Sequence, residues 1–259
     1  MIEAAFGVLS FAIAIALTPS IGRALEKRGY VGVDLHKGDG RRLPEMTGLA
    51  VLLGFSVSLS MAYVYYHEKA IIHGLIAVLL VGLIGLFDGV RKLEPREKIV
   101  GLAVAGLILL PIADTTLFGA DLGLLYLLGV PIFFAFTCNF TNMLAGFNGL
   151  EIGTGAIASM GIAVLSLLHG AEASFLMASV MAGGLLGLLY YNRYPARVFP
   201  GDVGTLPIGA ALFTAIILGK FEVLGIIVFI PYAVDAALKY FSVGVMTKES
   251  QEPTVAREG

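Results

Sequence analysis

Nine long apolar segments, separated by short polar stretches, constrain the fold of this chain more than any other feature of its sequence. A helix that spans a bilayer needs about 20 mostly apolar residues, and segments of that kind recur along the whole chain. Only 14% of the 259 residues are charged, compared with about 25% in an ordinary soluble domain. The sequence therefore predicts an all-α, polytopic membrane protein with about nine transmembrane helices. We expect these helices near residues 2–24, 47–66, 70–88, 98–113, 121–138, 152–168, 173–191, 204–219 and 222–246, the short fourth one being tilted or partly interfacial.

The basic residues indicate how the helices are oriented. Of 17 Lys and Arg residues, only Lys69 and Lys220 fall on the side of the membrane that holds the N-terminus. This bias predicts an outside N-terminus and a cytoplasmic face that carries the longer loops. The first helix has no basic region before it and no evident cleavage site, so we expect it to be retained. We expect one transmembrane catalytic domain over 1–246, cytoplasmic loops near 25–46, 89–98, 139–151 and 191–204, and a polar tail over 247–259.

Several kinds of site are not expected from the residues present. The single cysteine, Cys138, lies in an apolar run, so no disulfide can form within the chain. The four histidines are scattered, which makes a zinc site or a Ser-His-Asp arrangement improbable. Neither a P-loop nor a Rossmann glycine pattern is present, and we expect no nucleic-acid partner.

The polar stretch NFTNMLAGFNGLE, residues 139–151, lies between two apolar runs. Polar groups at the end of a membrane segment are costly to desolvate, so they should be satisfied by one another, by water or by a ligand. Asn139 and Asn142 share one helical face if the preceding helix continues, and Gly146 and Gly149 allow close approach of a ligand. The alternative is a plain interhelical loop with helix-capping asparagines.

Two further loops carry groups suited to phosphate. The stretch 34–48 is basic and suits anionic headgroups or a nucleotide diphosphate, although its bases could serve only as a topology signal. In the stretch 87–101, Asp88 ends one helix and Lys98 begins the next. Such a pair could bracket a phosphate together with its proton or metal.

The loop YYNRYPARVFPGDVGT, residues 190–205, places Asp202 in a Pro-Gly turn. A carboxylate there is a plausible magnesium ligand, because Mg²⁺ takes one or two carboxylates plus substrate phosphates. It could equally cap the following helix, and the two roles are compatible. Asp235, within the last apolar segment, is either a functional residue or a partner for a neighbouring helix. The residues alone thus indicate a membrane enzyme with a cytoplasmic, magnesium-dependent site for a phosphorylated substrate.

The four loops also resemble a known family. The motifs DLHKGDGRRLPE, GLFDGVRKLEPREK, NFTNMLAGFNGLE and VFPGDVGT occur in the order seen in polyprenyl-phosphate N-acetylhexosamine-1-phosphate transferases. The third is similar to the form of the eukaryotic and archaeal UDP-GlcNAc:dolichyl-phosphate GlcNAc-1-phosphate transferases, and it has Asn148 where the bacterial pentapeptide enzymes have Asp. The sequence departs from the family at Gly89, where a second Asp is usual. It ends after the ninth apolar segment and a short tail, where the family usually has a longer final loop and a tenth helix.

The resemblance implies transfer of GlcNAc-1-phosphate from UDP-GlcNAc to polyprenyl (dolichyl) phosphate on the cytoplasmic face, releasing UMP. This would be the first membrane step of glycan assembly, N-glycan assembly in particular, in a cell or ER membrane. Alternatives are the same chemistry with another UDP-N-acetylhexosamine, a lipid-phosphate transporter, or a pseudoenzyme; a homodimer is compatible with each. The resemblance assigns Mg²⁺, or Mn²⁺, to Asn148 and Asp202, the acceptor phosphate to Lys98, and orientation or deprotonation of the acceptor to Asp88. It places substrate contacts at Asp34, Leu35, Glu45, Asn139, Asn142, Asn148, Glu151 and Thr154.

Overall fold

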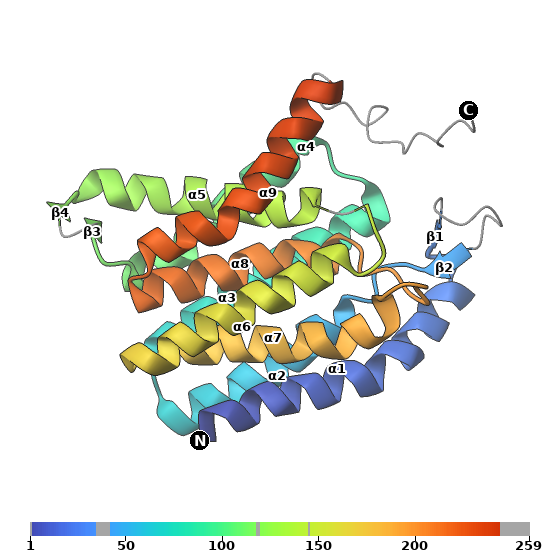
Figure 1. Ribbon diagram of the computed structural model, residues 1–259, viewed down its shortest axis with the longest axis horizontal. Helices are drawn as coiled ribbons and strands as arrows, with labels where there is room; N and C mark the ends of the chain where they lie inside the picture. Colours follow the sequence, from blue (N-terminus) through green and yellow to red (C-terminus); the bar gives the residue numbers. More distant parts are fainter. Residues whose placement is uncertain (1, 35–41, 118–119, 145, 244–259) are drawn as a thin grey trace.

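A computed structural model describes residues 2–34, 42–117, 120–144 and 146–243. Over these residues the chain is an all-α bundle of nine α-helices, as the sequence predicts, with two short hairpins at its ends (Figure 1). Eight of the helices are long and apolar enough to cross a membrane. The helices are α1 Ile2–Lys27, α2 Leu49–Tyr66, α3 Lys69–Arg91, α4 Pro95–Gly106, α5 Leu124–Met143, α6 Leu150–His169, α7 Glu172–Asn192, α8 Asp202–Gly219 and α9 Glu222–Val243.

The fourth helix differs from the expected 98–113. It begins at Pro95, where Glu94 and Glu97 form a reciprocal capping box, and it ends as an α-helix at Gly106. The chain then continues as a 3-10 helix, η1 Leu107–Ile112, which contains Pro111. Proline lacks an N–H and its ring would clash with the carbonyl four residues earlier, so α-helical hydrogen bonding cannot continue through this segment. Lys98 is thereby placed in the first turn of α4.

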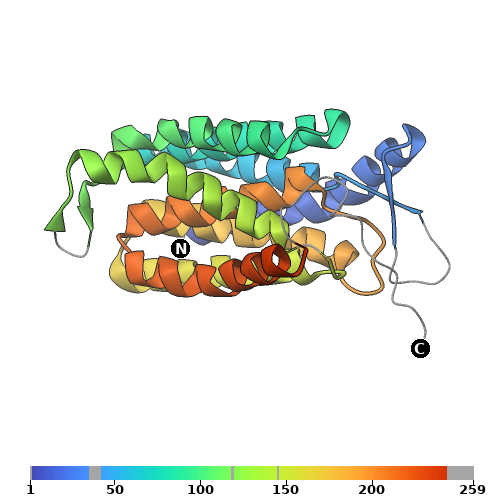
Figure 2. The same cartoon turned by 90° about the horizontal axis from the view of Figure 1, so that it is seen from above.

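The two hairpins lie at opposite ends of the bundle in both views (Figures 1 and 2). Strands β1 Val31–Val33 and β2 Arg42–Pro44 pair antiparallel, and so do β3 Thr116–Leu117 and β4 Ala120–Asp121. The first hairpin follows α1 and lies at the end that carries the starts of α4 and α8. The N-terminus of the chain lies at the other end (Figure 1).

Helices α7 and α8 form the buried centre, and most of their side chains are enclosed by the other helices. Backbone approaches backbone closely where α7 meets α1. A Cβ on Gly183 would overlap the carbonyl oxygen of Gly7, and a Cβ on Gly187 would lie 2.8 Å from the carbonyl oxygen of Phe11. Small residues at such crossings let membrane helices pack tightly, since lipid and side chains are equally apolar and close fit drives association.

Helix α9 is the most peripheral of the long helices. It packs against α5 and α8 and crosses the outer side of α5 (Figure 1). Only 17% of its apolar window is buried, compared with 72% for α7 and for α8. Its outward face is therefore left to lipid.

Candidate functional site

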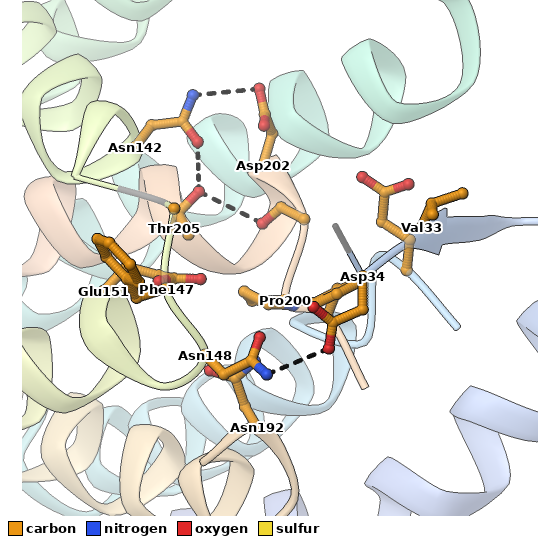
Figure 3. Close-up of a pocket in the computed structure, with 14 residues that line it drawn as sticks. Val33, Asp34, Asn142, Phe147, Asn148, Glu151, Asn192, Pro200, Asp202 and Thr205 are labelled. Atoms are coloured by element: carbon orange, nitrogen blue, oxygen red, sulfur yellow. Dashed lines mark hydrogen bonds between the residues drawn. The ribbon is translucent and has the colours of Figure 1, made fainter. Parts of the chain in front are cut away.

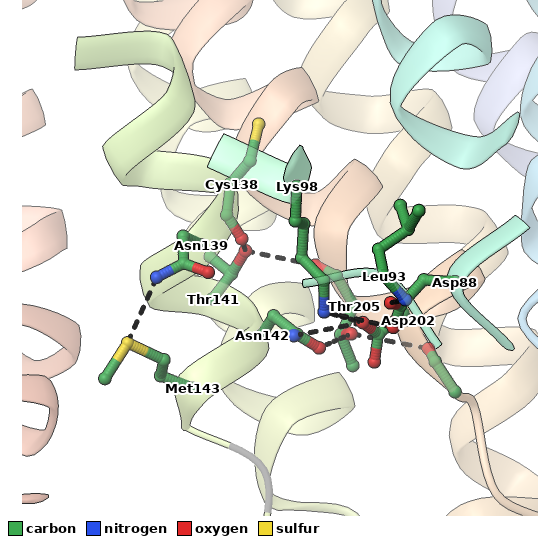
Figure 4. Close-up of polar contacts among 11 residues, drawn as sticks. Asp88, Leu93, Lys98, Cys138, Asn139, Thr141, Asn142, Met143, Asp202 and Thr205 are labelled. Carbon is green, nitrogen blue, oxygen red and sulfur yellow. Dashed lines mark hydrogen bonds and ion pairs between the residues drawn. The ribbon is translucent and has the colours of Figure 1, made fainter. Parts of the chain in front are cut away.

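Three charged side chains meet where α3 ends and where α4 and α8 begin (Figure 4). The Nζ atom of Lys98 lies 2.5 Å from Oδ2 of Asp202 and 3.0 Å from Oδ2 of Asp88. All three side chains are largely buried, so their charges are weakly screened by solvent. Burial by itself lowers the pKa of Lys98, but the carboxylates of Asp202 and Asp88 outweigh it and raise the pKa above its ordinary value. Lys98 is thus a charged ammonium shared by two carboxylates.

Asp88 also has a structural bond that fixes its orientation. Its Oδ1 accepts a hydrogen bond of 2.7 Å from the backbone N–H of Leu93, in the turn between α3 and α4. Lys92 adopts a left-handed conformation there, and its N–H donates to the carbonyl of Asp88 at 2.8 Å. One oxygen of Asp88 therefore holds the turn while the other faces Lys98.

Asn142 joins this cluster from the last turn of α5. Its Nδ2 lies 3.4 Å from Oδ2 of Asp202, and its Oδ1 accepts a hydrogen bond of 2.5 Å from Oγ1 of Thr205. Thr205 is one helical turn after Asp202 on α8, so both polar contacts of Asn142 bridge α5 to α8. The amide is held beside the carboxylate by these two contacts (Figure 4).

A cavity of about 260 Å³ opens beside Asp202 (Figure 3). It brings together four segments that are distant in sequence, and its polar side chains mix with two aromatic rings, Phe147 and Phe199. Across it, Nδ2 of Asn148 donates to Oδ2 of Asp34 at 3.3 Å. The lining residues are Val33, Asp34, Glu45, Asn142, Gly146, Phe147, Asn148, Glu151, Asn192, Phe199, Pro200, Gly201, Asp202 and Thr205.

Two buried oxygen atoms on the cavity wall have no hydrogen-bond partner within the described part of the chain: Oε2 of Glu151 and Oδ1 of Asn192. Glu151 is 6% exposed and Asn192 is fully buried. The amide nitrogen of Asn192 donates to the carbonyl of Val198 at 3.0 Å, so only the oxygen of its amide lacks a partner. Buried acceptors without partners are costly, and a ligand that carries N–H or O–H groups would satisfy them.

The residues predicted from sequence fall into groups. Lys98 contacts both Asp88 and Asp202, and Asn142 contacts Asp202. Asp34, Glu45, Asn148 and Glu151 line the adjoining cavity. Asn139 contacts Sδ of Met143 instead, and the hydroxyl of Thr154 donates to the carbonyl of Leu150, one turn along α6 from the cavity. Leu35 and the 247–259 tail lie outside the described residues.

The two expected metal ligands, Asn148 and Asp202, line the same cavity but have different hydrogen-bond partners. Asn148 bonds to Asp34, whereas Asn142 is the amide next to Asp202 (Figure 3). Among the described residues no three His, Cys, Asp or Glu side chains form a metal cluster. Mg²⁺ commonly takes only one or two protein carboxylates and completes its shell with phosphate and water oxygens. A donor set of Asp202 with a neighbouring amide oxygen fits that ion and would not fit zinc.

The cavity residues that were not predicted from the sequence include Asn192, Phe147, Phe199 and Thr205. The sequence held a signal for two of them, since Thr205 follows Asp202 by three residues on one helix face and Asn192 is a polar residue at the end of a membrane-length apolar run.

Asp235 was left open between two interpretations. It forms an ion pair with Lys239 at 2.8 Å on α9. Lys239 also donates to the carbonyl of Met143 at the end of α5.

Comparison with known proteins finds a matching family model and related sequences. Residues 71–220 match the model of glycosyl transferase family 4. The chain is 41% identical to a putative glycosyltransferase of Methanocaldococcus jannaschii over 88% of its own length and 72% of that protein. It is 32% identical to a putative UDP-N-acetylglucosamine–dolichyl-phosphate N-acetylglucosaminephosphotransferase of Saccharolobus solfataricus (90% and 76% covered). It is 31% identical to a phospho-N-acetylmuramoyl-pentapeptide-transferase of Shouchella clausii (85% and 76% covered).

Proposed function

The chain belongs to glycosyl transferase family 4, and on that premise we propose that it transfers N-acetylglucosamine-1-phosphate from UDP-GlcNAc to a polyprenyl phosphate of the dolichyl type. The products are polyprenyl-diphospho-GlcNAc and UMP. The observation that carries the proposal is the meeting of a shared Lys98 ammonium with a polar cavity at the ends of membrane helices. This arrangement suits a reaction between a water-soluble phosphate donor and a phosphate held at the lipid surface.

The cavity supports a nucleotide as donor. Phe147 and Phe199 offer apolar ring surface for a base, and polar groups surround them. The unpaired oxygens of Glu151 and Asn192 accept hydrogen bonds, and uracil and ribose carry N–H and O–H donors. A ligand without such N–H or O–H donors would leave both buried oxygens unsatisfied. The site therefore discriminates strongly against such a ligand.

The charged cluster supports phosphoryl transfer next to that cavity. An oxygen of the lipid phosphate forms a bond to the β-phosphorus of UDP-GlcNAc, while the bond from that phosphorus to the bridging oxygen breaks and UMP leaves. Lys98 binds the acceptor phosphate, and Asp88 orients Lys98 and keeps it charged. A phosphate monoester has its second pKa near 6, so it is mostly dianionic at pH 7 and needs little base catalysis. Positioning is therefore the main task of Asp88.

Mg²⁺ is the cofactor that these residues suit. Asp202 would hold it together with an amide oxygen of Asn142 or Asn148, both of which line the cavity. When bound, the ion supplies positive charge that stabilises the diphosphate and the leaving UMP. Rotation of the Asn142 amide would turn its oxygen toward Asp202, since the two ends of the amide are alike in shape.

We place this site on the cytoplasmic face of a multi-pass membrane protein, because the basic residues concentrate at the loops that carry it. The reaction would then begin glycan assembly on a lipid carrier, N-glycan assembly in particular. The chain is 32% identical to a relative named for UDP-GlcNAc and 31% identical to one named for a phospho-N-acetylmuramoyl-pentapeptide. The identity of the donor sugar therefore needs its own test.

The test is release of UMP by purified protein in detergent with polyprenyl phosphate, Mg²⁺ and a panel of labelled UDP-N-acetylhexosamines. We expect release with UDP-GlcNAc that requires the lipid phosphate, and none from an Asp202→Asn control. Release only with UDP-MurNAc-pentapeptide would move the chain to cell-wall chemistry. Lipid-phosphate binding without UMP release from any donor would refute the transferase.

A further inference from the structure

Met46 lies between the two structural elements that carry the site carboxylates. Its side chain is 3% exposed. On one side, a Cβ on Gly89 of α3 would overlap the Met46 sulfur and would lie 3.1 Å from its Cγ. On the other side, a Cβ on Gly201, the residue before Asp202, would lie 3.0 Å from the N and Cα atoms of Met46 and 3.2 Å from its Cγ. The thioether thus fills the space between α3 and the turn that begins α8.

The same face of α3 meets the backbone of Asp202 directly. A Cβ on Gly85 would lie 2.6 Å from the carbonyl carbon and oxygen of Asp202. Gly85 and Gly89 are four residues apart, so they lie on one face of α3 one turn apart. Neither glycine contributes a side chain, and at Gly89 the space toward the turn before α8 is filled by Met46.

The backbone around Met46 is fixed independently of its side chain. Met46 has a φ of +64°, which side-chain-bearing residues adopt rarely. The N–H and Oγ1 of Thr47 donate to the carbonyl of Phe199 at 3.1 and 2.8 Å, and the N–H of Gly48 donates to the carbonyl of Pro200 at 3.0 Å. These hydrogen bonds hold the segment after β2 against the turn before α8. The Met46 side chain extends from this segment and packs on α3 at Gly89.

We propose that Met46 is a positioning residue for Asp88 and Asp202. The length of its side chain sets the separation of α3 from the N-terminus of α8, and hence the separation at which both carboxylates reach Lys98. The expected effect of Met46 on turnover rests on the proposed function. The effect on the Lys98 ion pairs stands without it.

The closing experiment compares Met46→Ala with Met46→Leu and with a matched control, Met177→Ala. Met177 is also fully buried, and its thioether also packs on a glycine of α3, where a Cβ on Gly74 would lie 2.8 Å from its sulfur. Gly74 is 14 residues from Asp88, about 21 Å along the helix. Both alanine variants remove a buried thioether that packs on α3, but only Met46→Ala does so at the site.

Two measurements are made on each variant beside its Tm: turnover with UDP-GlcNAc, and the rate at which Lys98 is acetylated by acetic anhydride, followed by mass spectrometry. For Met46→Ala we expect kcat to fall by about 10- to 100-fold with a smaller change in KM, because small misplacements of reacting groups cost that much. We expect Lys98 acetylation to rise several-fold as its ion pairs loosen. Met46→Leu should behave as the wild type, and Met177→Ala should lower Tm without changing either measurement.

A second variant keeps the outcome interpretable. Gly89→Ala should lower kcat through overlap with the Met46 sulfur, and adding Met46→Ala should restore part of it, because the new methyl group enters the vacated space. Unchanged kcat and Lys98 acetylation in Met46→Ala would overturn the inference, and so would equal losses in Met177→Ala. A wild type without UMP release would refute the proposed function alone, since Lys98 acetylation still tests the position of the carboxylates.

Discussion

Replacing Lys98 by Met tests the electrostatic reasoning about the site most directly. Methionine keeps the length of the side chain and removes its charge. The two distances to Nζ, 2.5 and 3.0 Å, place the carboxylate oxygens of Asp202 and Asp88 no more than 5.5 Å apart. Two like charges at that separation repel by about 3 kcal/mol at an effective dielectric constant of about 20. A loss of about 3 kcal/mol lowers the Tm of a chain of this size by roughly 6–12 °C.

The assay is thermal unfolding in detergent, with UMP release measured in parallel. We expect Lys98→Met to lose both stability and turnover, and Lys98→Met with Asp88→Asn to regain most of the Tm but no turnover. The pKa of Lys98 is raised above its ordinary 10.5 by Asp202 and Asp88, despite the opposing effect of burial. A group with a raised folded-state pKa contributes its full stabilisation below its unfolded pKa, so the Tm deficit should not shrink as pH rises to about 9, and it should shrink only as pH rises further through the folded-state pKa of Lys98. A Tm of Lys98→Met within error of the wild type, or a Tm not regained in the double variant, would refute the reasoning.

Three further predictions concern other parts of the molecule. Asp202→Asn, or a chelator added to the wild type, should abolish UMP release while near-native Tm is retained; normal turnover in either case would remove the metal from the proposal. Asn192→Ala should raise the KM for UDP-GlcNAc by about tenfold through loss of a buried acceptor, with kcat changed less; an unchanged KM would contradict a nucleotide contact there. Gly183→Val should prevent α1 and α7 from packing, because its side chain would overlap the Gly7 carbonyl, and normal yield and Tm in that variant would contradict the close crossing.

The helical architecture could be predicted because it depends on segment length and polarity. The second helix was expected over 47–66 and is observed as α2 Leu49–Tyr66; the sixth was expected over 152–168 and is observed as α6 Leu150–His169. The end of α4 at Gly106 was harder to predict from the sequence, because it depends on how the structure accommodates Pro111. The hairpins were not predicted, because strands of two or three residues leave no periodic pattern.

The site could be predicted as a set of loops but not as a set of contacts. Asp88, Lys98 and Asp202 were each singled out, yet their shared ion pair joins residues 104 positions apart. The partner of Asn148 could not be read from its own stretch, because Asp34 lies 114 positions away. Local sequence indicates which polar groups need partners, whereas the crossing of distant helices decides which partners they find.

The loose attachment of α9 has a consequence for how this protein is handled outside its membrane. Most of the surface of α9 is not covered by the other helices, yet its Lys239 reaches the carbonyl of Met143, the residue that follows Asn142. A detergent that replaces the bilayer imperfectly should release this helix first and with it the end of α5. We therefore expect lipid to support the site through α9, and turnover in nanodiscs should exceed turnover in short-chain detergent at equal protein concentration.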